Sequence, residues 1–451
     1  MDTDKIEVGL DIGTTKICVI AGRRNEFGKL EILGMGKAVS EGVTRGMVTN
    51  IDKTVESIKT AIKEAEENAG LDIAEVSIGI AGQHIRSSKH HGVIMRSNPE
   101  NVINVEDVER LNNDMYKIVI PPGCNIIHVM PQDYTVDYTE GIKDPVGMVG
   151  SRLEADYHII TSQTAAINNI NRCVQKAGAE LGKKEFTCKN LILEPLASSL
   201  AVLTDEEMEA GIALVDIGGG TTDIAIFHEN IIRHTAVIPF GGNIITADIK
   251  QGCTLMHQQA EQLKTKFGAA LAQETSPNEI ISIPGLRNRP AKEISVKTLA
   301  QIIQARMEEM IEMVYAEIIA SGFQKKLAGG LVITGGGSLL KHVQHLFELK
   351  TGMDARIGYP NEHLGKCKID SVKSPMYATS IGLVLAGFQA IDQRENRYAE
   401  LKGKQTSDIK IMTKAPKLVT KPLGNGTDLF KNFIEKTKNM LMDDFDDKTG
   451  Y

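Results

Sequence analysis

Residues 8–20, VGLDIGTTKICVI, are matched later in the chain by residues 213–226, ALVDIGGGTTDIAI. Each segment has the pattern of an apolar strand, an aspartate, a turn rich in glycine and threonine, and a second apolar strand. An ordinary β-hairpin explains one such segment, but it does not explain two copies with aspartate at the same offset. The repeat therefore predicts two related α/β domains that hold one phosphorylated ligand from opposite sides.

The turns of both hairpins carry the groups that bind phosphate. Glycine has no Cβ, so its backbone N–H can come close to phosphate oxygens. Threonine adds a hydroxyl donor, and lysine adds a positive charge. The residues that we expect at the phosphates are Gly13, Thr14, Thr15, Lys16, Gly218, Gly219, Gly220, Thr221 and Thr222.

An aspartate ends the first strand of each hairpin. The carboxylates of Asp11 and Asp216 would repel a phosphate unless a cation lay between them. Mg²⁺ prefers oxygen ligands and usually keeps several waters, so we expect these aspartates to hold Mg²⁺ through water. Neither hairpin has the P-loop spacing or the helix that follows a P-loop.

A third glycine cluster follows a short apolar run near residue 331. We expect a strand that leads into Gly335, Gly336 and Gly337, with Ser338 capping a helix that begins near Leu339. Such a turn lets a flat base or a ribose lie against the backbone. Many α/β proteins end a strand in this way, so the cluster indicates a nucleotide site only in combination with the two hairpins.

In this order and spacing, the three clusters resemble the phosphate and adenosine motifs of the actin/Hsp70/sugar-kinase ATPase superfamily. Residues 193–200, LEPLASSL, and 374–382, SPMYATSIG, are similar to its two connecting motifs. The resemblance implies a duplicated actin-like α/β fold that binds ATP and Mg²⁺ between two large subdomains. It also places Glu261 and Lys264 beside the nucleoside.

Two further features of the expected site have alternative interpretations. Glu194 stands where some relatives place a residue that orients the attacking water, but a structural carboxylate at a strand end explains it equally well. Gly241 and Gly242 form either the turn that passes the phosphates or a purely structural turn.

Within that superfamily the chain is similar to the FtsA family of bacterial cell-division proteins. Three segments carry the likeness: residues 41–52, EGVTRGMVTNID; residues 79–85, GIAGQHI; and residues 141–154, GIKDPVGMVGSRLE. It covers about residues 5–390 and the final helix. The implied organisation is a first large subdomain (5–83 and 163–195), an inserted SHS2-like α+β domain (84–162), a second large subdomain (196–227 and 311–392), a small subdomain (228–310), a flexible linker (393–427) and an amphipathic helix (428–442).

Hydrophobic periodicity predicts the main elements directly. Helical spacing covers residues 51–69, 164–179 and 296–321, whereas the insert shows short β-like runs, including residues 117–120, 126–130 and 133–137. From about residue 395 the periodicity fails and lysine, proline and glycine become frequent, which is typical of a linker.

Composition narrows the class of protein. At 451 residues the chain can form two or three domains, each with its own core. A net charge of −7 argues against a general nucleic-acid binder. The six cysteines include no C-x-x-C pair, which indicates reduced thiols in a cytosolic protein. The polar N-terminus is not a signal peptide, and no apolar run reaches transmembrane length.

The C-terminal segment 428–442, DLFKNFIEKTKNMLM, has the pattern of a short amphipathic helix on a tether. Such a helix lies in the plane of a membrane surface, or it docks onto the body or onto another protein. One copy would bind lipid weakly, and a polymer carrying many copies would bind far more tightly. The residues expected at the membrane are Leu429, Phe430, Phe433, Ile434, Met440 and Leu441.

The FtsA resemblance implies an ATP-binding, self-associating adaptor, at most a slow ATPase, on the cytoplasmic face of the cell membrane. It would tether FtsZ polymers to lipid at the division site and help to recruit later division proteins. The expected contact surface for FtsZ is the small subdomain, residues 228–310. The alternatives are an active ATPase or small-molecule kinase of the same superfamily, and a pilus-assembly adaptor related to FtsA. The insert shows no obvious acceptor-sugar constellation, and the tethered helix favours the division protein.

Overall fold

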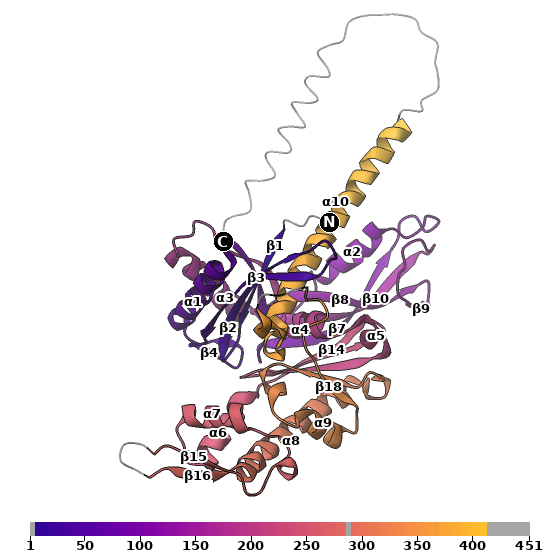
Figure 1. Ribbon diagram of the computed structural model, residues 1–451. Coiled ribbons are helices and arrows are strands. Elements are labelled where there is room, and N and C mark those ends of the chain that lie inside the picture. Colours follow the sequence, from indigo (N-terminus) through magenta and orange to yellow (C-terminus); the bar gives the residue numbers. More distant parts are fainter. Residues whose placement is uncertain (1–4, 286–289, 366, 368, 413–451) are drawn as a thin grey trace, which may run out of the picture. The chain divides into compact units, whose positions relative to one another are not determined.

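The computed structural model describes residues 5–285, 290–365, 367 and 369–412 (Figure 1). The chain divides into two compact units, Met1–Asp392 and Gln393–Tyr451. The first unit contains every element discussed below, apart from the distal part of one long helix.

The first sheet has the strand order β11-β6-β1-β2-β3. Its strands are β1 (Ile6–Ile12), β2 (Lys16–Arg24), β3 (Leu30–Val39), β6 (Glu75–Ile80) and β11 (Thr187–Leu193). A two-stranded ribbon of β4 (Val43–Thr44) and β5 (Met47–Val48) precedes the first helix. Helices α1 (Ile51–Ala69) and α3 (Thr164–Glu180) share a hydrophobic core with this sheet.

Helix α1 begins and ends where the sequence predicts. The side chain of Asn50 accepts a hydrogen bond from the backbone N–H of Lys53 at the N-terminus. At the C-terminus Gly70 adopts a left-handed conformation with φ of 67°, which glycine reaches without steric cost. The apolar residues Val55, Ile58 and Ile62 lie buried on one face.

The second sheet repeats the first, with the strand order β14-β13-β12-β17-β18. Its strands are β12 (Ile212–Ile217), β13 (Thr222–His228), β14 (Ile231–Ile238), β17 (Leu331–Thr334) and β18 (Ala355–Ile357). In both sheets an antiparallel hairpin pairs with a parallel strand on its other side: β1–β2 with β6, and β12–β13 with β17. The predicted duplication is therefore confirmed at the level of topology.

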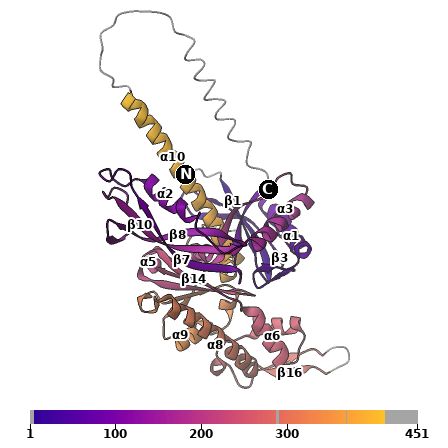
Figure 2. The same cartoon turned by 180° about the vertical axis from the view of Figure 1, so that it is seen from behind.

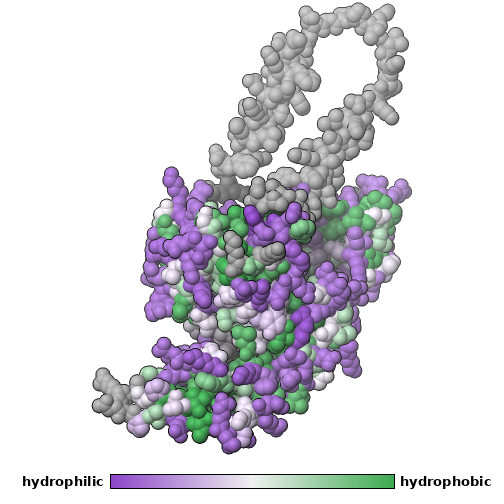
Figure 3. Space-filling view, in the orientation of Figure 1, coloured by the Kyte–Doolittle hydropathy of each residue, from purple (hydrophilic) through white to green (hydrophobic). Residues whose placement is uncertain are grey.

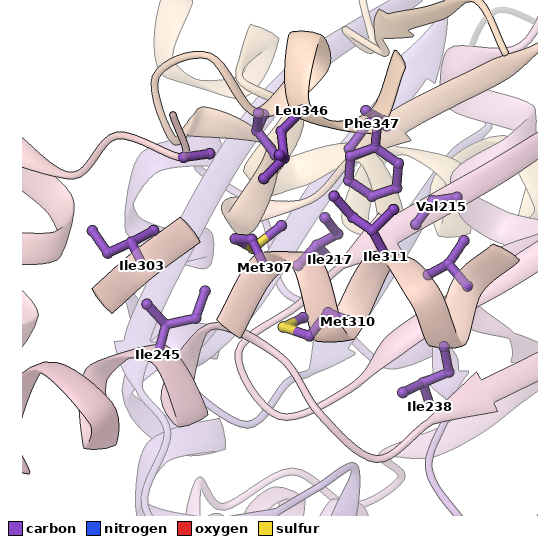
Figure 4. Packing of buried hydrophobic residues seen from close by; sticks show 14 of the residues in the cluster. Val215, Ile217, Ile238, Ile245, Ile303, Met307, Met310, Ile311, Leu346 and Phe347 are labelled. Carbon is purple, nitrogen blue, oxygen red and sulfur yellow. The ribbon is translucent and has the colours of Figure 1, made fainter. Parts of the chain in front are cut away.

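Helix α8 (Val296–Ser321) forms the largest core of the second half. Met307 and Ile311 on this helix lie close to Val215 and Ile217 of β12 in Figure 4, beside Phe347 of α9. The smaller elements of this half are α5 (Asp205–Ala210), α6 (Gly242–Gly252), α7 (His257–Phe267), α9 (Val343–Thr351), and the hairpin of β15 (Ile280–Ile283) and β16 (Lys292–Ser295).

The inserted domain is a four-stranded antiparallel sheet with one helix, entered after β6 and left before α3. Its strand order is β7-β10-β8-β9. The elements are β7 (Ile85–Met95), α2 (Val105–Met115), β8 (Cys124–Val136), β9 (Thr139–Ile142) and β10 (Arg152–Gln163). Strand β14 of the second sheet lies beside β7 and β8 in both views (Figures 1 and 2).

Two predictions for the inserted domain are wrong in detail. Residues 117–120 form no strand, and Val119 is 95% exposed. Two prolines follow directly, and no strand in the described part of the chain pairs with the segment. The two short β-like runs near residues 126–137 are one long strand, β8, which pairs with β10 through two irregularities of register.

Helices α4 (Glu194–Val202) and α10 (Ala378–Met412) connect the two halves. Helix α10 extends to Met412, so the first part of the expected linker is helical rather than irregular. Residues 391–412 contain no proline and a single glycine, and they are rich in Glu, Lys, Arg and Gln, which favour helix. The rest of the expected linker and the terminal helix 428–442 lie outside the described residues.

No helix in the described part of the chain combines the length and the apolar character needed to cross a membrane. Figure 3 shows mostly hydrophilic residues on the visible face, interrupted by smaller apolar areas.

Candidate functional site

The turns of the two repeated hairpins together line one side of a cavity of about 570 Å³. The turn after β17 and helices α6 and α7 complete its walls. Most of the residues expected from the sequence line it: Asp11, Gly13, Thr14, Thr15, Lys16, Glu194, Asp216, Gly218, Gly219, Gly220, Thr221, Gly242, Glu261, Lys264, Gly335, Gly336 and Gly337.

The two hairpin turns touch, and only glycine allows this contact. A Cβ atom on Gly219 would lie 2.4 Å from the side chain of Thr15, and one on Gly220 would lie 2.5 Å from Thr14 Oγ1. The backbone N–H groups and threonine hydroxyls of both halves are therefore concentrated in one small volume. This arrangement suits an anion with many oxygens, such as a chain of phosphates.

Each of the two repeated aspartates is held by hydroxyl groups. Asp11 Oδ2 accepts hydrogen bonds from Lys16 Nζ at 2.9 Å and from Ser380 Oγ at 2.9 Å. Asp216 Oδ2 accepts hydrogen bonds from Ser198 Oγ at 2.6 Å and from Thr379 Oγ1 at 3.2 Å. Both carboxylates are thus fixed in orientation before any ligand binds.

Four carboxyl groups, those of Asp11, Glu194, Asp216 and Asp223, crowd this region. Burial raises the pKa of Asp216, and burial together with the charge of Asp216 raises the pKa of Asp223 to about 8. Burial, followed by the charges of Asp11, Asp223 and Asp216, raises the pKa of Glu194 well above its usual range. A divalent cation would relieve this repulsion, and carboxylate oxygens are the ligands that Mg²⁺ prefers.

Lysine side chains supply positive charge at two places in the cavity wall. Burial by itself would lower the pKa of Lys16, but the charge of Asp11, the charge of Cys18 and the hydrogen bond to Asp11 together outweigh burial and raise the pKa. Lys264 Nζ donates to the carbonyl oxygen of Gly242 and to Thr246 Oγ1, both at 2.8 Å, and it pairs with Glu261. Burial lowers the pKa of Lys264.

Two family models and several known proteins are similar to this chain in sequence. Residues 213–382 match the family model described as cell division protein FtsA, and residues 82–161 match that of the SHS2 domain inserted in FtsA. A cell division protein FtsA of Pseudomonas aeruginosa is 40% identical over 389 residues, which cover 86% of this chain and 91% of that protein. The FtsA of Escherichia coli K12 is 33% identical over 412 residues, which cover 90% of this chain and 95% of that protein.

The chain belongs to the FtsA family.

Membership of the FtsA family makes this chain an actin-like cell-division protein with an inserted SHS2 domain. A more distant protein shares only the fold. A chain of the PilM-PilN type IV pilus biogenesis complex superposes with a TM-score of 0.61 at 15% identity, and the match covers 84% of this chain and 98% of that one. The expected superfamily resemblance and the expected FtsA resemblance are both confirmed.

Three residues predicted for the site of this FtsA chain do not line the cavity. Thr222 Oγ1 donates to the carbonyl oxygen of Phe240 at 2.8 Å, and Gly241 packs against the carbonyl oxygen of Gly218. Ser338 is 4% exposed, and its Oγ donates to the carbonyl oxygen of Gly335 at 2.7 Å. All three contact backbone atoms of the turns or of the segment that follows them.

The expected helix beginning near Leu339 is also wrong. A 3-10 turn occupies Gly336–Leu339, and α9 starts only at Val343, with His342 at its N-cap and no side-chain cap. Ser338 cannot cap α9 because its hydroxyl is used inside the turn, where Gly335 adopts φ of 81°.

Sequence analysis missed several residues at this FtsA site. Asp223 lines the cavity and lies directly opposite Asp216 in the β12–β13 register, so the hairpin pairing alone would have revealed it. Ser198, Thr379 and Ser380 lie in the two connecting motifs, but nothing local in the sequence links them to the aspartates. The other missed residues that line the cavity are Ile12, Gly46, Asn243, Ile245, Thr265, Leu339, Leu340 and Met376.

The environment of Glu194 explains a glycine of the FtsA-like segment 79–85. A Cβ on Gly79 would lie 2.9 Å from Glu194 Cγ, so glycine at the end of β6 makes room for this side chain. Glu194 is the first residue of α4, and its side chain lines the cavity. Both interpretations of Glu194 remain compatible with this position.

Proposed function

We propose that this FtsA chain binds ATP with Mg²⁺ in the cavity and self-associates in the nucleotide-bound form. We propose further that it tethers polymers of FtsZ to the cytoplasmic membrane and helps to recruit later division proteins. The observation that carries the proposal is the direct contact of two glycine–threonine turns in one cavity, each with a hydroxyl-bonded aspartate. A ligand that bridges these turns fixes the two halves relative to each other.

Each group in the wall has a defined role in this proposal. The backbone at Gly13 and at Gly218–Gly220, with Thr14, Thr15 and Thr221, would donate to phosphate oxygens, and Lys16 would offset their charge. Glu261 and Lys264 would lie beside the ribose, with the turn Gly335–Gly337 beside the base. Thr222, Gly241 and Ser338 would act only through the turns that they support.

The proposed Mg²⁺ would neutralise phosphate charge between the two aspartates. Asp11 and Asp216 would hold the ion through water, and phosphate oxygens would supply further ligands, as is common for Mg²⁺. The fit rests on the donor set, because these aspartates belong to a group of four crowded carboxyl groups that a cation would stabilise. Neither aspartate needs to move for this role, since both are already fixed by hydroxyl groups.

Glu194 permits a test of whether the site also hydrolyses ATP. If Glu194 orients water, Glu194→Gln should leave ATP affinity unchanged within a factor of about three and lower slow ATP hydrolysis roughly 10²-fold or more. Single-turnover hydrolysis and nucleotide binding, measured on the same preparation, check this. Equal hydrolysis by both proteins would make Glu194 a structural carboxylate.

Self-association and the proposed membrane anchor can be tested together on a lipid monolayer by electron microscopy. With ATP and Mg²⁺, the full chain should form filaments on the lipid, and a chain ending at residue 427 should form none there. Stoichiometric phosphoryl transfer from ATP to a metabolite would overturn the adaptor function in favour of a kinase.

The proposed FtsZ contact lies on residues 228–310, which a binding assay with the isolated FtsZ polymer would map.

A further inference from the structure

Helices α4 and α10 cross with their backbones in contact beside the cavity. A Cβ atom on Gly382 would lie 1.7 Å from the carbonyl oxygen of Ala197, so no other residue fits at this crossing without a shift. Helix α4 follows β11 of the first sheet and leads into the second half, whereas α10 returns from the second half to pack against β1 at Gly9. The crossing is therefore a point at which both connections between the halves meet.

Three hydroxyl groups next to this crossing point at the two aspartates of the site. Ser198 on α4 donates to Asp216 Oδ2 at 2.6 Å, and the single hydroxyl proton of Thr379 on α10 is shared between Asp216 Oδ2 at 3.2 Å and Ser198 Oγ at 3.0 Å. Ser380, the next residue on α10, donates to Asp11 Oδ2. One helix turn of α10 thus holds the carboxylates of both halves at once.

In both aspartates the hydroxyl groups bond to Oδ2 and not to Oδ1. Among the residues that the structure describes, no hydrogen-bond donor is placed on Oδ1 of Asp11 or of Asp216. Asp216 Oδ1 lies beside Gly335, and Asp11 Oδ1 lies beside Gly13; both glycines line the cavity. The free oxygens are the ones available to a cation or to its waters.

We propose that Ser198, Thr379 and Ser380 are positioning residues of the cation site. They orient Asp216 and Asp11 so that one oxygen of each faces the waters of a bound divalent ion. This inference rests on the proposed binding of ATP with Mg²⁺ and assigns to the connecting helices a role beyond linking the halves. Because Ser198 and Thr379 come from different helices, a change in the crossing would shift both hydrogen bonds to Asp216.

The short bond from Ser198 supports a functional orientation of Asp216. Its length of 2.6 Å is typical of a hydroxyl that donates to a charged carboxylate. Loss of a hydrogen-bond partner of this kind typically weakens metal binding by about 10- to 100-fold, because the ligand loses its fixed orientation. Removal of a hydroxyl that only stabilises the fold would not weaken metal binding in this way.

The experiment is an Mg²⁺ titration of ATP binding, measured with a fluorescent ATP analogue and with Mn²⁺ as a spectroscopic substitute. Ser198→Ala and Thr379→Val should each raise the Mg²⁺ concentration at half-maximal ATP binding roughly 10-fold or more. At saturating Mg²⁺, the ATP affinity should approach that of the unmodified chain. General structural damage would instead lower the affinity at every Mg²⁺ concentration.

Two variants serve as matched controls. Thr379→Ser keeps the hydroxyl and should behave like the unmodified chain. Ser199→Ala removes an equally buried hydroxyl one residue along α4, which donates to the carbonyl oxygen of Leu196 rather than to an aspartate. It should leave the Mg²⁺ requirement unchanged within about twofold, whereas its partner Ser198→Ala should not.

The outcomes separate this inference from the function on which it rests. If the unmodified chain binds no ATP with Mg²⁺, the proposed function fails and the positioning role fails with it. If it binds ATP with Mg²⁺, but Ser198→Ala and Thr379→Val match their controls, only the positioning role is wrong. Thermal unfolding in EDTA reports folding separately, and Thr379→Val carries the test if Ser198→Ala does not fold, because Thr379 is only partly buried.

Discussion

Asp216→Ala is expected to abolish Mg²⁺-dependent ATP binding and nucleotide-dependent self-assembly together. Asp216 is the only carboxylate that both connecting helices hold among the described residues, through Ser198 and Thr379. Without it the phosphates would meet the turns of the second half with no cation bridge to Asp11. In the unmodified chain, ATP at 100 times its Kd should stabilise the fold by about 2.7 kcal/mol, and the variant should show no such shift.

Thermal unfolding with and without Mg²⁺-ATP, together with ATP-dependent sedimentation of polymers, measures both effects on one preparation. Asp205→Ala is a suitable control, since Asp205 is an exposed aspartate at the start of α5 in the same half. It should retain the ATP-induced stabilisation. Polymers of Asp216→Ala that form without nucleotide would show that closure of the cavity does not control assembly.

Phe433→Glu is expected to abolish membrane binding while ATP binding stays intact. The substitution replaces an apolar side chain worth up to about 1.5–3 kcal/mol of burial with a charge in the middle of the apolar face that the sequence predicts for residues 428–442. Because a polymer multiplies the contribution of each tail, even a partial loss per copy removes binding of the assembly. Co-sedimentation with vesicles that contain anionic lipid, in the presence of ATP, measures the change.

Asn439→Glu provides the matched control because it adds the same charge on the polar side of the segment. It should reduce vesicle binding only slightly. If Phe433→Glu still pellets with vesicles, residues 428–442 are not the anchor, and the alternative of docking onto protein gains support. Both variants should show the same ATP-induced thermal stabilisation as the unmodified chain.

Local sequence pattern was sufficient to predict helix α1 and the repeated hairpins. Helix α1 has the predicted bounds because its apolar spacing, its N-cap Asn50 and its terminal Gly70 all act within a few residues of one another. The hairpin of β12 and β13 was equally predictable, because alternating apolar residues and a glycine turn determine the pairing of Asp216 with Asp223.

Prediction failed where a residue's role depends on a distant partner. Residues 117–120 have strand-forming side chains, but the sheet offers them no neighbour. Ser338 has the composition of a helix cap, yet its hydroxyl is used by the carbonyl of Gly335. The loss of apolar periodicity predicts a linker from residue 393, whereas the high helix propensity of residues 393–412 continues α10.

The two phosphate-type hairpins, the inserted α+β domain and the resemblance to FtsA can all be found in the sequence. The fold was needed to find that Ser198, Thr379 and Ser380 hold the two aspartates, and that Thr222, Gly241 and Ser338 contact backbone atoms instead of lining the cavity. The reason is physical. A turn or a helix is set by interactions between neighbours in the chain, whereas these hydroxyls reach the aspartates only because α4 and α10 cross in contact at Ala197 and Gly382.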